Sequence, residues 1–184
     1  MDRLSLFAVL LTAAAMAASA VAAPVECACD AAEPATLTAR QCGLCKAAEA
    51  QPADTKIFFL KDINPRKANR LLALPRPHTG GNHELHDMSP LDRTLLWTAA
   101  IDKAKELWGP AWGVAYNGAK VRTQCHTHIH IGKLLNGVEE GKFIVISKPS
   151  QIPARPGEGL WIHPAGNRMH VHIGEQTTET VLLR

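Results

Sequence analysis

Between Cys125 and Ile131, histidines alternate strictly with β-branched residues, and no other segment constrains the fold as tightly. Successive side chains of a β-strand point to opposite faces of the sheet. His126, His128 and His130 would therefore share one face, and the residues between them would share the other, which can be buried. Three imidazoles in a row displace apolar core surface, so we expect them to have a chemical role.

Short apolar runs, bounded by Gly, Pro or Asn, predict the other strands. They lie at residues 57–60, 71–74, 114–116, 143–146, 160–163 and 169–173, with 180–183 as a candidate edge strand. The turn sequence Ala165-Gly166-Asn167 predicts that the runs on either side of it form a hairpin.

One long helix is expected between the runs at 71–74 and 114–116. Ser89 can cap its N-terminus, Pro90 suits the first helical position, and Gly109-Pro110 ends it. The predicted buried face carries the apolar residues that recur at helical spacing, Leu91, Leu95, Ala99 and Ala100. The order of elements predicts an α+β chain with an antiparallel sheet, one main helix and an extra C-terminal β-hairpin.

The chain opens with the features of an export signal. Arg3 precedes an apolar run over residues 4–18, and small residues follow, so residues 1–22 are predicted to be a signal peptide cut after Ala22. An uncleaved membrane anchor is the alternative, because the run is close to spanning length. Residues 23–55 are interpreted as a cysteine-containing, loop-rich arm and residues 56–184 as one domain. The protein is thus expected to be periplasmic or secreted, or else membrane-anchored.

Cysteine pairing follows from that location. The five cysteines are Cys27, Cys29, Cys42, Cys45 and Cys125. In an oxidising compartment the four N-terminal ones can pair with each other, which leaves Cys125 over.

The net charge and the aromatic residues do not identify a binding partner. The formal net charge is +3, and the basic residues form no dense run with interleaved aromatics, so nucleic acid is not expected as a partner. Trp108 and Trp112 lie near the end of the predicted helix. Tryptophans near a loop can lie at lipid headgroups, which would give peripheral membrane contact, although burial in the core is the commoner role.

Two uses of the histidine face fit its chemistry. Neutral imidazole is a common metal ligand. Imidazole is also nucleophilic near pH 7 and forms covalent intermediates, so one histidine can attack phosphorus while its neighbours hold the ring and the phosphate oxygens. The residue types alone leave both uses open.

The run His126-x-His128-x-His130 followed by apolar residues resembles the motif of the histidine-triad superfamily. The resemblance extends to Cys42-x-x-Cys45-Lys46, to Asp62-Ile63-Asn64-Pro65 and to segment 72–78, and it covers about residues 42–135. It implies a histidine-triad-like antiparallel sheet and a nucleotide substrate.

A narrower branch shares further residues with this chain. Asn117 followed by Arg122-Thr123-Gln124 just before the triad is similar to the CDP-diacylglycerol pyrophosphatases, which are exported or membrane-anchored. This chain is shorter than typical members, and its Cys-x-x-Cys resembles the soluble branch instead. A lipid-nucleotide substrate is therefore one expectation within the superfamily.

The resemblance also implies residue roles. His128 would attack the α-phosphorus, and water would then release the nucleoside monophosphate. The other implied catalytic residues are His130, Gln124 and His126, and the implied substrate-binding residues are Asp62, Asn117, Arg122 and Thr123. Asp62 as a turn residue, Asn117 as a strand cap and Arg122 as a solvated strand residue are the structural alternatives. Catalysis would need no cofactor, and a homodimer is the state found in the soluble branch.

In superfamily members that carry a Cys-x-x-Cys motif, similar positions form a structural zinc site, so the resemblance implies such a site here. Its ligands here would be Cys42, Cys45, His78 and His126, because two thiolates and two imidazoles suit tetrahedral zinc. Disulfides from Cys42 and Cys45 to Cys27 and Cys29 are the alternative.

Three functions remain open at this point. The first is hydrolysis of a nucleotide phosphoanhydride, with CDP-diacylglycerol cleaved to CMP and phosphatidate as its most specific form. The second is hydrolysis or nucleotidyl transfer on soluble nucleotides, and the third is periplasmic metal binding. The C-terminal residues His163, His170 and His172 are interpreted as exposed hairpin histidines, with a metal site or pocket wall as the alternative.

Overall fold

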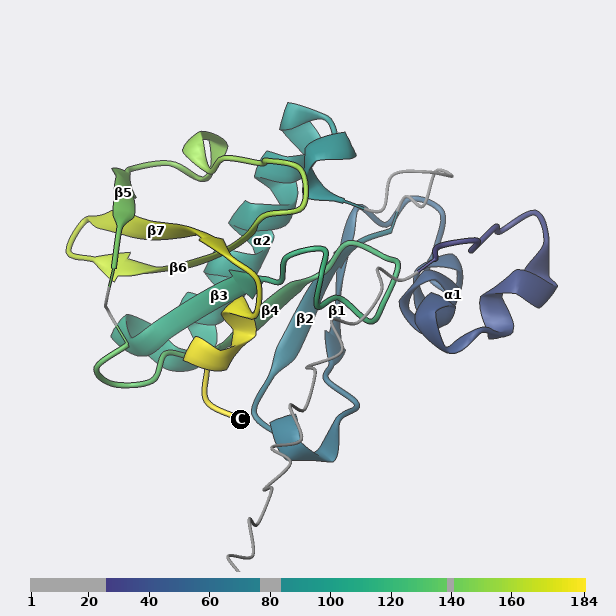
Figure 1. Ribbon diagram of the computed structural model, residues 1–184, viewed down its shortest axis with the longest axis horizontal. Helices are drawn as coiled ribbons and strands as arrows, with labels where there is room; N and C mark the ends of the chain where they lie inside the picture. Colours follow the sequence, from purple (N-terminus) through teal and green to yellow (C-terminus); the bar gives the residue numbers. More distant parts are fainter. Residues whose placement is uncertain (1–25, 77–83, 139–140) are drawn as a thin grey trace, which may run out of the picture.

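Seven antiparallel strands form one sheet in the computed structural model, which describes residues 26–76, 84–138 and 141–184 (Figure 1). The strands are β1 Ile57–Lys61, β2 Leu71–Pro75, β3 Trp112–Tyr116, β4 Ile129–Lys133, β5 Phe143–Ile146, β6 Gly159–Ala165 and β7 Arg168–Glu175. Their order across the sheet is β1-β2-β4-β3-β6-β7-β5. The predicted α+β class, with a C-terminal β6–β7 hairpin, is confirmed. The predicted signal peptide lies outside the described residues.

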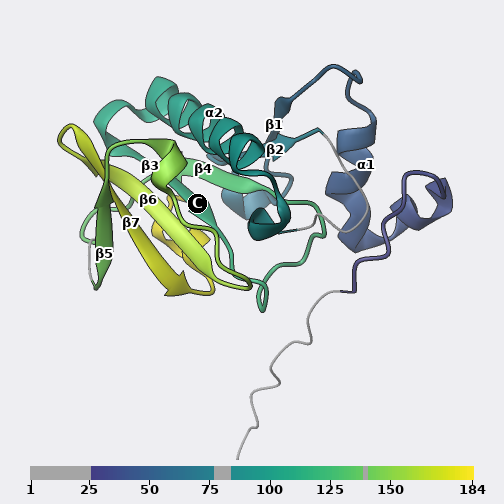
Figure 2. The same cartoon turned by 90° about the horizontal axis from the view of Figure 1, so that it is seen from above.

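The main helix, α2 (Pro90–Trp108), covers one face of the sheet (Figure 2). Its predicted ends are confirmed, since the Ser89 hydroxyl accepts from the Asp92 N–H at 3.1 Å and Gly109 leaves the helix with a φ of 51°. The predicted buried face is wrong at Leu91 and Leu95, which are exposed. The helix instead buries the next stripe, Leu96, Trp97, Ala100, Ile101 and Ala104, because that stripe faces the sheet.

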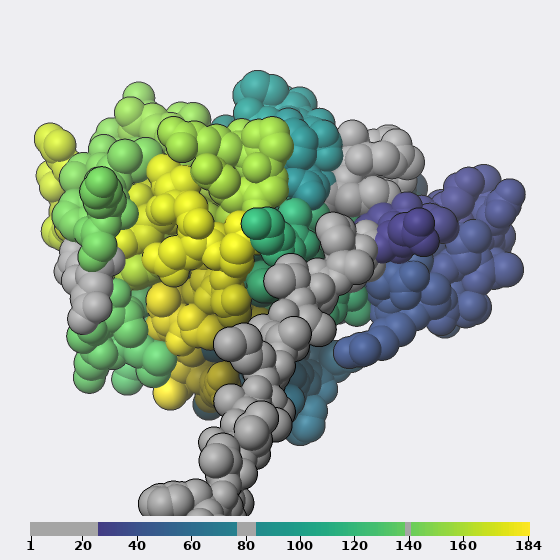
Figure 3. All heavy atoms as spheres, viewed as in Figure 1, coloured from purple at the N-terminus to yellow at the C-terminus, as the bar shows by residue number. Residues whose placement is uncertain are grey.

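A short helix in the N-terminal segment packs at the β1 edge, on the sheet face away from α2. α1 (Gly43–Glu49) lies in the segment interpreted as a loop-rich arm, where no pattern predicted a helix. Ala48 of α1 packs with Phe58, Leu72 and Leu74 of the first two strands. Figure 3 shows this purple and blue region at the opposite end of the molecule from the green and yellow β5–β7 end.

The histidine segment is only partly a strand. β4 begins at Ile129, so the strand predicted from Cys125 is wrong for its first four residues. The neighbouring strand β2 pairs with β4 up to Ala73↔Ile129 and ends at Pro75, which has no N–H to donate. The N–H of Cys125 instead donates to the carbonyl of Gln41 at 2.8 Å.

The predicted edge strand at 180–183 is also wrong. Residues Thr178–Val181 form a 3-10 helix, η7, and Leu182 makes a single bridge to Leu134. Leu182 packs with Trp161 and Ala115 on the sheet face away from α2. Among the described residues, none of the helices has the length and apolar character needed to cross a bilayer.

Candidate active site

A pocket of about 540 Å³ opens between α1 and the end of β1. Its walls come from α1 with Arg40, from β1 and the loop after it, and from the segment before β4. Polar and charged side chains in these walls are Arg40, Lys61, Asp62, Asn64, Lys67, Thr123, Gln124 and His130, and the apolar ones include Leu44, Leu60 and Leu72. The pocket therefore has an apolar side and a mainly basic side.

His128 does not itself line this pocket, but its ring contacts that of the lining residue His130, with the two ring centroids 4.9 Å apart. The Nδ1 of His128 is 2.8 Å from the carbonyl oxygen of His126. A carbonyl only accepts, so Nδ1 carries the proton and Nε2 keeps its lone pair. Burial lowers the pKa of His128, and the nearby charge of Arg122 lowers it further. His128 is thus a neutral imidazole with a free Nε2 near pH 7.

His130 has a protein group beside each ring nitrogen, and Nε2 is the one that makes a hydrogen bond. Its Nε2 lies 3.3 Å from Nδ2 of Asn117, whose Oδ1 accepts from the Thr178 hydroxyl at 3.2 Å and from the Glu179 N–H at 3.1 Å. Those two donors orient the amide, so its NH₂ group faces His130 and the His130 Nε2 accepts. The proton of His130 is therefore on Nδ1, which lies 3.5 Å from Oε2 of Glu179.

The Glu179 carboxylate lies beside His130 and forms ion pairs with two basic side chains. Its Oε2 lies 2.5 Å from Nζ of Lys67 and 2.7 Å from a guanidinium nitrogen of Arg70. Arg70 is 2% exposed and also donates to the carbonyls of Leu182 and Leu183. Burial lowers the pKa of His130 well below its usual range, and the positive charges of Lys67 and Arg70 add to this effect.

Motif reasoning missed these three residues. Lys67 and Arg70 follow Asp62-Ile63-Asn64-Pro65 within five positions, so a basic cluster beside that motif was a usable signal. Glu179 lies in η7, far along the chain, and nothing in its local sequence marks it.

Asp62 stabilises the turn after β1 and also lines the pocket. Its Oδ1 accepts from the N–H of Asn64 at 2.9 Å, as in an Asx-turn. Its Oδ2 lies 3.9 Å from Nζ of Lys67, at the pocket wall. One carboxylate oxygen is thus used by the turn and the other remains able to accept from a ligand.

Gln124 and Thr123 both line the pocket. The Gln124 side chain donates to the carbonyl of Arg40 at 2.9 Å and accepts from the N–H of Leu44 at 3.3 Å. Gln124 therefore joins the histidine segment to the start of α1. Thr123 is exposed in the pocket wall.

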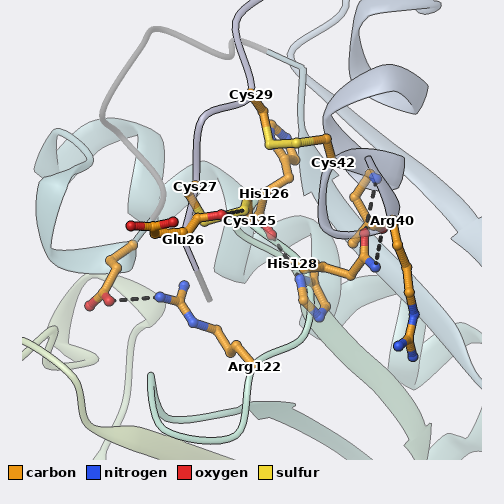
Figure 4. The surroundings of a disulfide bond; sticks show 12 residues. Glu26, Cys27, Cys29, Arg40, Cys42, Arg122, Cys125, His126 and His128 are labelled. Atoms are coloured by element: carbon orange, nitrogen blue, oxygen red, sulfur yellow. Dashed lines mark hydrogen bonds and ion pairs between the residues drawn. A yellow bond between two sulfur atoms is a disulfide. The ribbon is translucent and has the colours of Figure 1, made fainter. Parts of the chain in front are cut away.

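The Arg122 side chain is held by two residues that do not line the pocket, Glu84 and Tyr116. Its guanidinium lies 2.6 Å from Oε1 of Glu84 and donates to the hydroxyl of Tyr116 at 2.9 Å. Burial raises the pKa of Tyr116 to about 12, so this phenol stays protonated. In Figure 4, Arg122 and Arg40 appear on either side of His128.

The disulfide alternative is the one that the structure adopts, and one of its two bridges, Cys29–Cys42, is among the predicted pairings. Cys27 pairs with Cys125, and Cys29 pairs with Cys42 (Figure 4). The prediction that Cys125 is left over is wrong, because the N-terminal segment runs past the start of the histidine segment. Cys45 is the buried free thiol, and burial raises its pKa to about 11.

This pairing removes the ligands expected for zinc. Cys42 is committed to a disulfide, and Nε2 of His126 donates to the carbonyl of Pro75 at 2.6 Å. Cys45 keeps its proton, and His78 lies outside the described residues. The expected set of Cys42, Cys45, His78 and His126 is therefore not assembled as zinc ligands, and His126 instead anchors the histidine segment to β2.

A second group offers metal-ligand atoms, but two basic side chains already pair with its carboxylates. Asp62, His130 and Glu179 bring one such atom each within 4.8 Å of one another. The Glu179 carboxylate already pairs with Lys67 and Arg70. A divalent cation bound there would be repelled by these two nearby positive charges.

The C-terminal histidines are not surface residues. His163 and His172 are 3% and 1% exposed, so the predicted exposure is wrong for both. Their Nε2 atoms lie 3.3 Å apart, and His172 stacks on Trp161 with ring centroids 3.6 Å apart. Aromatic packing on the sheet face away from α2 explains their burial. Trp112 is also buried in the core, with Trp108 packed against it.

Folding stability should depend on pH through the two triad imidazoles. His128 and His130 have folded-state pKa values below the ordinary 6.5, so the unfolded chain binds more protons as the pH falls. Their contribution is full above pH 6.5 and is lost below it, with a slope of up to about 2.7 kcal/mol per pH unit for two protons. Urea unfolding between pH 7.5 and 5 measures this slope, and His128→Asn should halve it. An unchanged slope in the variant would contradict the buried neutral state of His128.

Comparison with known proteins assigns this chain to no family. The chain matches no family model, and a search of curated proteins returns no match.

Proposed function

We propose that this chain is a hydrolase of the histidine-triad type, which cleaves a nucleotide phosphoanhydride through a nucleotidyl intermediate on His128. The observation that carries the proposal is the state of His128. Its Nδ1 proton is held by the His126 carbonyl, its pKa is lowered by burial, and its ring, with the Nε2 lone pair available, contacts His130 in the wall of a mainly basic pocket. The resemblance of residues 42–135 to the superfamily supports the same assignment.

The first step follows from that geometry. The Nε2 lone pair attacks the α-phosphorus, the P–N bond forms, and the P–O bond to the leaving phosphate breaks. The electron pair of the broken bond departs on the leaving oxygen. In the second step water attacks phosphorus, the P–N bond breaks, and the nucleoside monophosphate leaves with His128 restored.

The pocket supplies the remaining contacts. Lys61, Lys67 and Arg40 provide positive charge for the phosphate oxygens. The free Oδ2 of Asp62 can accept from ribose hydroxyls, and the apolar wall formed by Leu44 and its neighbours can cover the base. Arg122 acts at a distance, since its charge keeps His128 unprotonated.

We assign His130 a positioning role alone, whereas the resemblance implies that it both binds phosphate oxygens and holds the attack geometry. Both of its ring nitrogens are turned to protein groups, Asn117 on one side and Glu179 on the other. His130 is therefore suited to holding its neighbour's ring and the pocket wall, rather than to donating to the phosphate. Gln124 likewise acts by joining this segment to α1.

Product analysis tests the proposal. The mature protein is incubated with CDP-diacylglycerol in detergent and, separately, with soluble dinucleoside polyphosphates and nucleotide sugars. We expect a nucleoside monophosphate from at least one class. Release of CMP from the lipid alone assigns a lipid-nucleotide substrate, and release from the soluble panel alone assigns the soluble class. No monophosphate from any substrate would overturn the proposal and favour metal binding.

A further inference from the structure

A smaller basic depression adjoins the pocket. Its lining residues are Asn64, Arg66, Lys67 and Arg184, and its volume is about 120 Å³. Asn64 and Lys67 line the large pocket as well, so the two hollows share a wall. A ligand in the large pocket can therefore continue into the depression.

The loop after β1 and the C-terminal segment together build this depression. Asn64 caps the 3-10 helix η3 (Pro65–Lys67), since its Oδ1 accepts from the N–H of Arg66 at 3.0 Å. The main-chain carbonyl of Arg184 accepts from Nδ2 of Asn69 at 3.0 Å, which holds the C-terminal segment beside the loop. The cations thus come from two segments that are far apart in sequence but attached to each other.

The charges in the depression favour an anion. Three of its four lining side chains are cationic, and none is acidic. Burial lowers the pKa of Arg70, and the nearby positive charge of Arg184 adds to this effect. Lys67 is the cation common to both hollows, and its ion pair with Glu179 holds it at the shared wall. Guanidinium groups bind phosphate oxygens through paired N–H donors.

The size of the depression limits the ligand. A volume of about 120 Å³ is well below the roughly 300–1,000 Å³ of pockets that enclose a drug-sized molecule. It suits a phosphate group and excludes a second nucleoside.

We propose that Arg66, Lys67 and Arg184 bind the leaving phosphate, so that the substrates are nucleotides with a phosphoanhydride and an anionic leaving group. This inference rests on the proposed function, because the large pocket must hold the phosphate that His128 attacks. The departing phosphate monoester gains negative charge as the P–O bond breaks, and the three cations stabilise that charge electrostatically. Nucleoside phosphoramidates and aryl esters lack this phosphate and gain nothing from the depression.

The experiment compares two substrates that share one nucleoside monophosphoryl group. One is a nucleoside diphosphate ester, and the other is the p-nitrophenyl ester of the same nucleoside monophosphate. The test variant is the double substitution Arg66→Gln with Arg184→Gln, which removes two exposed charges and spares the ion pairs of Lys67. The control is Arg155→Gln with Arg168→Gln, which removes the same charge from elsewhere on the surface.

We expect the test variant to raise KM for the diphosphate ester by at least about tenfold and to leave KM for the aryl ester within about twofold. The control should change neither value beyond about twofold. An equal loss on both substrates, or no loss on either, would overturn the subsite.

Direct binding separates this subsite from the proposed function. Calorimetry measures the binding of inorganic pyrophosphate to the wild type, to the test variant and to the control. If the wild type turns over neither substrate, the proposed function fails, but pyrophosphate affinity still decides the subsite. Weakening by about tenfold in the test variant alone supports it, and equal affinity in all three proteins refutes it.

Discussion

Replacing His128 by alanine should lower turnover at least about a thousandfold while the fold is retained. The variant loses the Nε2 lone pair that forms the P–N bond, and no neighbouring group can replace it. His130 is adjacent, but its ring nitrogens face Asn117 and Glu179. The loss should appear in kcat for every substrate that the wild type cleaves, with circular dichroism unchanged.

A matched histidine variant and a trapping experiment sharpen this test. His170→Ala removes an imidazole from β7, outside the pocket, and should keep nearly full activity. Acid-quenched wild-type protein should carry one nucleotidyl group that is absent from His128→Ala, as seen by mass spectrometry. Activity above a few per cent in His128→Ala would refute the covalent mechanism.

Removing the Cys27–Cys125 disulfide should produce the largest loss of stability. The two cysteines are 98 residues apart, and the chain-entropy model gives about 4.7 kcal/mol for a loop of that length. The Cys29–Cys42 bridge closes 13 residues and gives about 3 kcal/mol in the same model. The double variant Cys27→Ser with Cys125→Ser should therefore lose more free energy of unfolding than Cys29→Ser with Cys42→Ser.

Urea unfolding of both double variants, without reductant, measures this difference. An equal or larger loss for the short bridge would show that local strain, rather than loop closure, decides the outcome. Activity adds a second readout. Cys125 directly follows Gln124 and precedes His126, so the long-bridge variant should also raise KM by loosening the pocket wall formed with α1.

Both predictions concern one short segment. Residues 125–128 pair with no strand in the described part of the chain. They are held by the disulfide to Cys27, by the Cys125 N–H on the Gln41 carbonyl and by the His126 side chain on the Pro75 carbonyl. This arrangement turns the backbone so that the His126 carbonyl meets Nδ1 of His128. A regular strand would direct that carbonyl to a neighbouring strand. The irregular backbone is therefore what orients the proposed nucleophile.

Local signals in the sequence were sufficient for much of the fold. Ser89, Pro90 and Gly109 marked the ends of α2, because capping depends on residues within one turn. Apolar runs bounded by turn residues located the strands for the same reason. The histidine alternation located the candidate site, since the side-chain chemistry at those positions does not depend on how the strand ends.

The tertiary structure decided everything that joins distant segments. Four of the five cysteines form two bridges, and the spacing of the cysteines admits several connectivities. The sequence pattern does not predict α1, which is only seven residues long and is stabilised by packing on β1 and β2. Glu179 reaches His130 from η7 through a turn near the end of the chain. Sequence by itself thus determined the class of fold and located the candidate site, because both depend on local patterns. Only the tertiary structure decided the tautomers, the disulfide partners and the cations around the pocket, because these depend on which distant groups meet.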